Sequence, residues 1–336
     1  MKFAFAVLLL LSGFSLADAP KEVQQGFEVR GHYGLVPHPK EIPAKMPHKG
    51  INLAYPGKFD LGSLVELPPI KNQASCGSCV YFATTYAMEL AYRLRGETLP
   101  KLAPQHIMDC LNREWMCNGS FFSKVAGGVV KKGSVAQESD YPYKASNQSC
   151  KGDPAQLFGK FTGYKIIEND AKSIIAQLHE LNPVPTTIGA GGGWPGNGKV
   201  TSCQSIGTNH QVVIIGYDCE TAVDAAGDCK FDAQGNLPKG VGTWRIANSW
   251  GTGSGDKGFV TMKMTDGSGR KCYNVTEEAG IIEVGIDPNP PSPVSFTVQS
   301  RSGKNKLNAT WKPGAPYSVE QAKQKLQNAV NSVEAK

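Results

Sequence analysis

The fold of this chain is decided by the stretch Pro69-Ile70-Lys71-Asn72-Gln73-Ala74-Ser75-Cys76-Gly77-Ser78-Cys79-Val80-Tyr81-Phe82-Ala83. From Val80 onward the apolar residues recur near helical spacing, so we predict a helix that begins at Cys79 with Ser78 as its N-cap. A thiol at that position lies beside unpaired backbone N–H groups and the positive end of the helix dipole, which favours thiolate over thiol. Cys79 therefore stands where a nucleophile would be made.

The composition is that of a globular protein with material for a large core, at 336 residues, 40% hydrophobic and 19% charged. The net charge of +6 is spread along the chain without a Lys/Arg block, which gives little support to a nucleic-acid partner. Residues 1–17 have the basic start, the short apolar run and the small residues of a secretory signal. Because no later run of 18 apolar residues follows, we expect an exported protein without a membrane span.

The nine cysteines are typical of an oxidising compartment, where disulfides persist. Nine is an odd number, and Cys79 is the candidate for the thiol left over. Two other interpretations of Cys76-Gly77-Ser78-Cys79 have little support. A redox pair needs a thioredoxin-like βαβ context, and a zinc knuckle needs a second close Cys/His pair. We therefore expect neither a metal nor another cofactor.

The chain divides into a signal sequence at 1–17, a segment at 18–54, a main domain at 55–286 and an extension at 287–336. The segment at 18–54 is repeatedly broken by proline, and is either an extended arm on the domain or a pro-segment lying across a cleft. The extension starts with a Pro-rich linker, continues with β-prone residues and ends in a helix that starts after Ser318. The main domain shows an α+β pattern, a helical half followed by a strand-rich half. The helices are predicted near 79–94, 102–110 and 121–132, and the strands at 211–217, 242–247, 258–263 and 281–284.

A cysteine nucleophile needs a base, and the chain has six histidines. His106 and His179 lie in polar, helix-like contexts and are expected at the surface. His210 precedes an apolar strand, and Asn248 follows another. A histidine at a strand edge is more often structural when it stands alone, but an Asn amide can bind one imidazole nitrogen and leave the other facing a thiol.

Taken together, these residues resemble the papain-like cysteine peptidases, the family of papain and the lysosomal cathepsins. The resemblance covers about residues 59–286, and its motifs occur in the family's order: Lys71–Cys79, Cys110–Gly119, Asp140–Tyr143, Asn209–His210 and Asn248–Gly251. His210 lies 131 residues after Cys79 (210 − 79), which matches the family spacing. The resemblance implies a two-lobed α+β papain-like fold, with a helical N-terminal lobe, a β-barrel-like C-terminal lobe and the active-site cleft between them.

The resemblance also implies roles for single residues. Cys79 is expected to be the nucleophile, His210 its base and later the acid, and Asn248 the group that orients the imidazole ring. Trp250 would shield that hydrogen bond from water, and Gln73 would donate to the oxyanion beside the Cys79 backbone N–H. The expected substrate-binding residues are Gly119, Ser120, Asn209, Trp250 and Glu277.

The function so implied is that of a secreted, monomeric cysteine endopeptidase that cuts proteins or peptides through a Cys79 thiolate/His210 imidazolium pair and a thioester acyl-enzyme. Its own pro-segment would inhibit it, and its compartment would be extracellular, periplasmic or lysosome-like. Two alternatives stay open: a catalytically silent binding protein with this fold, and an exopeptidase of the same family. An intact Cys, His, Asn and Gln set favours activity.

Matching the family implies the disulfides Cys76–Cys117, Cys110–Cys150 and Cys203–Cys272. The two remaining cysteines, Cys219 and Cys229, would then form a disulfide within their own loop, a pair that the family pattern does not include.

The chain also departs from the family pattern. Val80 stands where the family has Trp, Ser120 where it has a second Gly, and the segment 188–207 is short and Gly-rich. Glu277, five residues after Cys272, corresponds to an acidic pocket floor in cathepsin B. Glu278 would take that place if the register slips by one residue.

Overall fold

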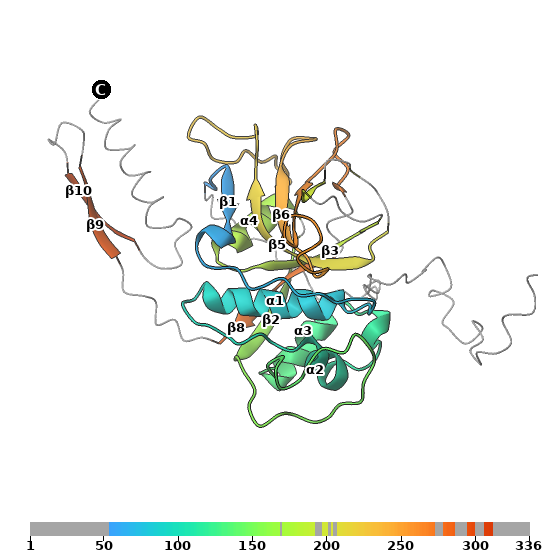
Figure 1. Ribbon diagram of the computed structural model, residues 1–336. Coiled ribbons are helices and arrows are strands. Elements are labelled where there is room, and N and C mark those ends of the chain that lie inside the picture. Colours follow the sequence, from blue (N-terminus) through green and yellow to red (C-terminus); the bar gives the residue numbers. More distant parts are fainter. Residues whose placement is uncertain are drawn as a thin grey trace, which may run out of the picture. The chain divides into compact units, whose positions relative to one another are not determined.

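The computed structural model describes residues 54–168, 170–191, 197–200, 203, 207–272, 278–285, 294–299 and 306–311 (Figure 1). The predicted signal sequence, nearly all of the predicted pro-segment, the Pro-rich linker and the predicted C-terminal helix lie outside these residues. No helix in the described part of the chain is both long and apolar enough to cross a membrane.

The central helix α1 (Cys79–Arg93) begins at the predicted residue, and every residue from Cys79 to Tyr92 is buried. One side of the helix packs on the sheet, where Tyr86 and Leu90 join a cluster of strand residues. Its other side packs on the remaining helices, where Tyr81 and Met88 join a second cluster. A helix buried on all sides needs apolar residues all round, which explains why its sequence carries few charges.

The other helices are α2 (Pro104–His106), α3 (Phe122–Lys132) and α4 (Ala171–His179). The predicted helix at 102–110 is therefore only partly α-helical, because α2 runs directly into a π-helical turn at Ile107–Leu111. The Leu111 carbonyl of that turn lies 2.7 Å from where a Cβ on Gly128 of α3 would stand. Glycine at 128 thus allows α3 to pack closely on the turn. Short 3₁₀ turns lie at Leu61–Ser63 and Met116–Asn118.

Eight strands form one sheet, in the order β2-β8-β3-β5-β6-β7-β4, with β1 also paired to β5. All neighbours are antiparallel except β4 and β7. Together with the helices the sheet gives the α+β class that the sequence predicts. The strands are β1 (Lys58–Asp60), β2 (Phe161–Ile167), β3 (Val184–Ile188), β4 (Lys199–Val200), β5 (His210–Asp218), β6 (Thr243–Ala247), β7 (Phe259–Lys263) and β8 (Ala279–Val284).

The antiparallel pair β5–β6 sets the position of the site. Val213 lies opposite Ala247, so the first residue of β5 and the last of β6 meet at the same edge of the sheet. Both strands are buried there because β3 and β7 flank them and α1 packs against β5. Residues 54–60, which precede α1 in the chain, reach the sheet as well through β1.

The predicted surface positions of His106 and His179 are wrong. His106 is fully buried and His179 is 4% exposed. His179 Nε2 lies 2.7 Å from the Tyr217 hydroxyl, and its ring stacks on Phe59 at 4.3 Å between centroids. In both residues a ring nitrogen lies within hydrogen-bond distance of a partner. A polar side chain that is paired in this way can be buried even where the neighbouring sequence suggests a surface position.

In the C-terminal extension, β9 (Val294–Gln299) and β10 (Lys306–Trp311) form an antiparallel pair in which Val294 lies opposite Trp311. These strands agree with the β-prone residues of the sequence. They form a two-stranded sheet of their own, separate from the eight-stranded sheet.

Candidate active site

Cys79 is the first residue of α1 and is fully buried. It is the one cysteine of the nine that takes part in no disulfide. Ser78 occupies the N-cap position as predicted, and its side chain makes no capping hydrogen bond. Cys79 thus lies at the positive end of the helix dipole, which favours a negative charge on its thiol.

His210 and Asn248 are brought together by the ends of β5 and β6. His210 Nε2 lies 2.8 Å from Asn248 Oδ1, and both side chains are buried. Because Oδ1 can only accept, Nε2 carries the proton of this hydrogen bond, and Nδ1 is the nitrogen that remains for acid–base chemistry. The Trp250 ring stacks on the His210 ring, with 4.7 Å between centroids and 27° between planes. The tryptophan therefore covers one face of the imidazole, and its shielding of the hydrogen bond from water stays a prediction.

Gln73 is fully buried in the loop before α1. Its Nε2 donates to the Cys76 carbonyl at 3.0 Å, and its Oε1 accepts from the Ser249 hydroxyl at 2.6 Å. Its backbone N–H also donates to the Ser249 carbonyl at 2.8 Å. Ser249 follows Asn248 directly, so the loop that carries Gln73 is tied to the same strand end that carries the histidine partner. Sequence reasoning gave Ser249 no role.

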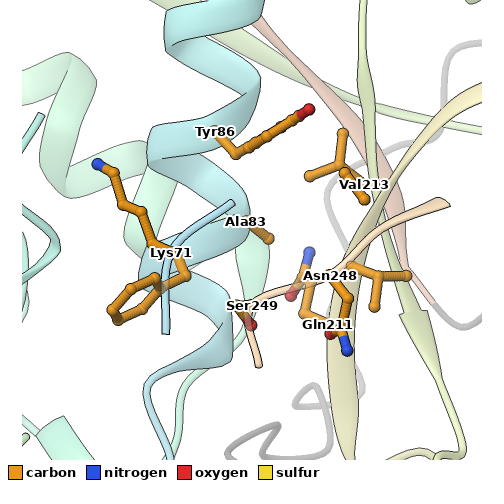
Figure 2. Close-up of a pocket in the computed structure, with 10 residues that line it drawn as sticks. Lys71, Ala83, Tyr86, Gln211, Val213, Asn248 and Ser249 are labelled. Atoms are coloured by element: carbon orange, nitrogen blue, oxygen red, sulfur yellow. The ribbon is translucent and has the colours of Figure 1, made fainter. Parts of the chain in front are cut away.

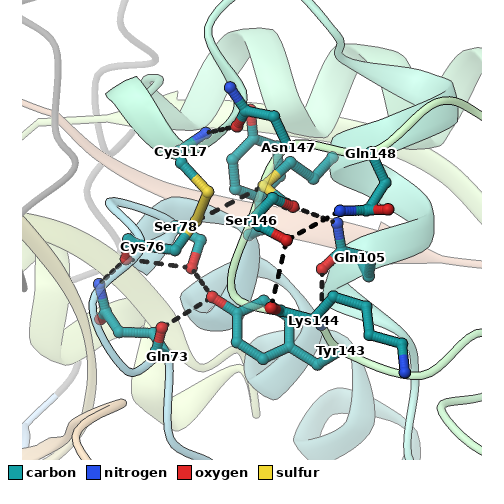
Figure 3. Close-up of a disulfide and its surroundings, with 12 residues drawn as sticks. Gln73, Cys76, Ser78, Gln105, Cys117, Tyr143, Lys144, Ser146, Asn147 and Gln148 are labelled. Carbon is teal, nitrogen blue, oxygen red and sulfur yellow. Dashed lines mark hydrogen bonds between the residues drawn. A yellow bond between two sulfur atoms is a disulfide. The ribbon is translucent and has the colours of Figure 1, made fainter.

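Tyr143 is a second residue whose role sequence reasoning missed, although its motif was among those that carry the family resemblance. Its hydroxyl donates to the Gln73 carbonyl at 2.7 Å and lies 2.6 Å from the Ser78 hydroxyl (Figure 3). Burial raises the pKa of Tyr143 to about 12, so the hydroxyl keeps its proton at neutral pH. The edge of the ring also packs on Phe82 of α1. Tyr143 thus joins the Gln73 segment to the residue before Cys79.

The predicted substrate-binding loop lies beside α1. Gly77 N–H donates to the Cys117 carbonyl at 2.9 Å, and the Cys76–Cys117 disulfide links the same two segments. Gly119 has φ of +107°, a conformation that favours glycine. The Ser120 side chain is turned inward, where its hydroxyl accepts from Asn112 Nδ2 at 2.9 Å. A serine therefore fits at 120 without changing the backbone that faces the site.

Asn209 uses both ends of its amide on the backbone of Ala190, with Nδ2 donating to the carbonyl and Oδ1 accepting from the N–H, each at 2.8 Å. The Asn209 amide is therefore already paired within the protein, and substrate binding by Asn209 stays a prediction that would rest on its backbone groups.

Glu277 lies outside the described residues. Its neighbour Glu278 is buried, and its two carboxylate oxygens accept from the backbone N–H groups of Phe122 and Ser123, each at 2.9 Å. That carboxylate holds the N-terminus of α3, where its charge is favoured by the helix dipole.

All four cysteine pairs expected from the sequence are disulfides in the structure: Cys76–Cys117, Cys110–Cys150, Cys203–Cys272 and Cys219–Cys229. Val80, which stands in place of the family's Trp, is fully buried in the cluster on the helical side of α1. Among the described residues, no group of three His, Cys, Asp or Glu side chains could hold a metal ion.

Comparison with known proteins finds relatives of this chain in sequence and in fold. Viral cathepsins are similar to this chain in sequence. The one from Rachiplusia ou multiple nucleopolyhedrovirus is 29% identical over 211 residues, which cover 62% of this chain and 59% of the relative. The one from Spodoptera exigua nuclear polyhedrosis virus is 29% identical over 231 residues, covering 68% and 62%. This chain thus spans about three-fifths of the length of these relatives.

Three solved structures are similar in fold. A Carica candamarcensis cysteine protease in complex with E-64 has 24% identity and a TM-score of 0.54, covering 68% of this chain and 98% of that one. The procathepsin L2 of Tenebrio molitor has 23% identity and a TM-score of 0.58, covering 80% and 82%. A proform of the ragweed cysteine protease Amb a 11 has 25% identity and a TM-score of 0.57, covering 71% and 69%.

The sequence model of the papain family of cysteine proteases matches residues 55–281. That range contains all nine cysteines, the histidine and the asparagine on which the site is built. The match takes in more than half of the sequence, and this chain therefore belongs to the papain family of cysteine proteases.

Proposed function

We propose that this chain is an active cysteine endopeptidase with Cys79 as nucleophile and His210 as general base and acid. The observation that carries the proposal is the hydrogen bond of 2.8 Å between His210 Nε2 and Asn248 Oδ1 beneath Trp250, together with Cys79 at the start of α1. Asn248 orients the ring so that Nδ1 serves the thiol. A silent member of the family would have no need to retain all of these groups.

In the first half of the reaction His210 Nδ1 holds the thiol proton, and the Cys79 thiolate attacks the peptide carbonyl carbon, forming a C–S bond. The peptide C–N bond then breaks, and His210 gives its proton to the leaving amine. The result is a thioester between Cys79 and the acyl part of the substrate. In the second half His210 removes a proton from water, which attacks the thioester, and Cys79 is released with the acid product.

The carbonyl oxygen of the substrate carries negative charge at each attack. We assign two donors to it, the Cys79 backbone N–H and an N–H of Gln73 Nε2. Gln73 is suited to this task because Ser249 and the Cys76 carbonyl fix both ends of its amide before substrate binds. A donor fixed in advance needs no reorganisation during the reaction, and removing one such donor costs roughly 10²–10³ in rate.

The test of this function is covalent labelling by an epoxide of the E-64 type, combined with hydrolysis of dipeptide reporters. Cys79→Ala and His210→Ala should abolish hydrolysis, and Asn248→Ala should cause a smaller loss because it only orients the ring. Unchanged thermal unfolding of Cys79→Ala would show that the fold is intact. Substantial hydrolysis by clean Cys79→Ala protein would overturn the mechanism, and a wild-type protein that neither labels nor cleaves would favour the silent binding protein. Release of single terminal residues, without internal cleavage, would favour an exopeptidase.

For substrate choice we propose Glu277 as the acidic floor of an otherwise apolar pocket. Glu278, the alternative, uses both of its carboxylate oxygens on the start of α3. A carboxylate in that pocket would pair with Arg while its walls accept Phe, so both Phe-Arg and Arg-Arg reporters should be cleaved. Arg-Arg cleavage should fall as pH drops and the carboxylate is protonated. Glu277→Ala should lose Arg-Arg cleavage and keep Phe-Arg, and an equal loss of both would remove Glu277 from the pocket.

We further propose that residues 1–17 are a signal sequence and that residues 18–54 are a removable inhibitory segment. Two of the similar structures are proforms, which supports an inhibitory segment. The protein would then act as a monomer on protein or peptide substrates in an extracellular, periplasmic or lysosome-like compartment. Incubation at mildly acidic pH should raise activity and yield a new N-terminus near Tyr55. A full-length protein that is fully active and never shortens would contradict this.

A further inference from the structure

A small cavity lies directly behind the site, where α1 faces the ends of β5 and β6 (Figure 2). Ala83 and Tyr86 of α1 line it on one side, and Gln211, Val213 and Asn248 line it on the other. The space is about what one water molecule needs. Asn248 therefore faces His210 with its Oδ1 and contributes to the wall of this cavity.

Four of the side chains that line the cavity are polar and buried, and all of them except Ser249, which donates to Gln73, carry an atom that lacks a hydrogen-bond partner among the described residues. Gln211 is fully buried, and neither Oε1 nor Nε2 of its amide has a hydrogen-bond partner among the described residues. The same holds for the Tyr86 hydroxyl and for Asn248 Nδ2, on side chains that are 7% and 5% exposed. Buried polar atoms in native proteins are nearly always paired, with protein or with ordered water. These unpaired polar atoms surround one water-sized space, which indicates that a single bound molecule is their common hydrogen-bond partner.

Water matches this set of atoms in both of its roles. Asn248 Nδ2 can only donate, Gln211 Oε1 can only accept, and the Tyr86 hydroxyl can do either. A water molecule accepts two hydrogen bonds and donates two, and buried waters usually make about three. No apolar ligand would satisfy these groups. The one charged residue in the lining, Lys71, directs its ammonium group to Glu89 and the Leu102 carbonyl, so it does not supply a charged partner for an ion.

We propose that this cavity binds one ordered water through Gln211, Tyr86 and Asn248, and that the water fixes the direction of the Asn248 side chain. Gln211 and Tyr86 are then positioning residues for the reaction, since they act on His210 only through Asn248. The inference rests on the proposed peptidase function.

The direction of Asn248 matters because its amide has two unlike ends. With Oδ1 toward His210 Nε2 the hydrogen bond of 2.8 Å forms, whereas with the amide reversed two N–H groups would face each other. A water that accepts from Nδ2 and is itself held by Gln211 and Tyr86 favours the first arrangement. Without it the amide loses the partner that distinguishes its two ends, and the fraction of productive His210 rings falls.

The test combines kinetics in two backgrounds with crystallography. Gln211→Met and Tyr86→Phe remove polar atoms at nearly unchanged volume, and Tyr164→Phe removes a hydroxyl outside the cavity as the matched control. In wild type, each cavity variant should lower kcat about five-fold with KM unchanged, as expected for one lost hydrogen bond, and the control should not. In the Asn248→Ala background the same substitutions should cause no further loss of kcat. Unliganded crystals of the wild-type protein should show water density between Gln211 and Asn248.

Equal losses of kcat in the wild-type and Asn248→Ala backgrounds would overturn the inference, because the residues would then act without Asn248. A high-resolution structure that shows the Gln211 amide bonded to protein and no water beside Asn248 Nδ2 would also overturn it. If the chain proves to have no peptidase activity, the proposed function fails by itself, and the crystallographic result still decides whether the water site exists. Should Gln211→Met fail to fold, Tyr86→Phe, which loses a single oxygen, carries the kinetic test.

Discussion

Tyr143 connects two backbone segments that the proposed reaction needs in fixed relation. Its hydroxyl lies between the Gln73 carbonyl and the Ser78 hydroxyl, so it couples the proposed donor to the oxyanion with the residue before the proposed nucleophile. Tyr143→Phe removes both hydrogen bonds at unchanged ring volume. We expect kcat/KM of a dipeptide reporter to fall about ten-fold, from two bonds of about 1 kcal/mol each with some relaxation.

Tyr92→Phe is the matched control for that substitution. The Tyr92 hydroxyl also makes hydrogen bonds with backbone groups, the carbonyl and the N–H of Lys160. Neither Tyr92 nor Lys160 belongs to the loop that carries Gln73. This control should change stability and leave kcat/KM as it is. If Tyr143→Phe were as active as the wild-type protein, the coupling between Gln73 and Ser78 would have no part in catalysis.

Among the elements, α2 contains a titratable group whose burial should affect folding. The backbone N–H of Ala136 donates to His106 Nδ1 at 3.3 Å, so the ring is neutral with its proton on Nε2, which lies 3.1 Å from Asp153. Burial lowers the pKa of His106, and the nearby Asp153, which would raise it, does not compensate. Protonating Nδ1 would also set two N–H groups against each other.

The sign of the pH effect follows from that lowered pKa. Below about pH 6.5 His106 becomes protonated in the unfolded chain, whereas its lowered pKa keeps it neutral in the folded chain. Stability due to this group is therefore present above pH 6.5 and lost as pH falls, by up to about 1.4 kcal/mol per pH unit. Urea unfolding of His106→Gln between pH 7.5 and 5 should show a flatter dependence than wild type. Parallel curves for the two proteins would show that His106 contributes nothing to acid sensitivity.

The elements next to strong local signals could be predicted from the sequence. α1 begins at Cys79 as predicted, and β5 and β6 fall within a residue of their predicted bounds. The helix start and the two strands are recognisable because their local sequences carry the signal. The strands β2 and β3 and the helix α4 were not predicted, since their residues read as mixed segments and gain their structure from packing on the sheet.

At the site, motifs named the residues that we propose take part in the reaction, but they did not name the residues that hold these in place. Ser249 and Tyr143 act through hydrogen bonds to the Gln73 side chain and backbone across 176 and 70 residues. Such partners depend on how loops meet in space. The burial of His106 and His179 escaped prediction for the same reason, whereas an inward Glu278 was one of two alternatives left open by the sequence. Only pairs already fixed by the family, such as Cys203–Cys272, could be assigned across long separations.

For the whole molecule, the four disulfides should contribute unequally. Cys203–Cys272 closes a sequence separation of 69 residues, and Cys219–Cys229 closes one of 10. The loss of chain entropy in the unfolded state grows with loop length, to about 4 kcal/mol for the longer loop and about 2.5 kcal/mol for the shorter one. Replacing each pair by serines should lower the free energy of unfolding in urea in that order. Equal losses for the two pairs would show that strain or residual structure outweighs the entropy term.

The last prediction concerns how much of the chain the catalytic unit needs. β8, which ends at Val284, is the last strand in the eight-stranded sheet, and β9 and β10 pair with each other in a sheet of their own. The family match ends at residue 281, and no residue assigned to the reaction lies beyond it. A chain that ends after Asp287 should therefore keep kcat/KM within about two-fold, which is less than the loss of one hydrogen bond would cause. Its thermal unfolding midpoint should also stay close to that of the full chain. A matched chain ending after Ala279, which removes most of β8, should fail to fold. If the longer truncation product stays folded but loses peptide hydrolysis, the extension supports the site directly.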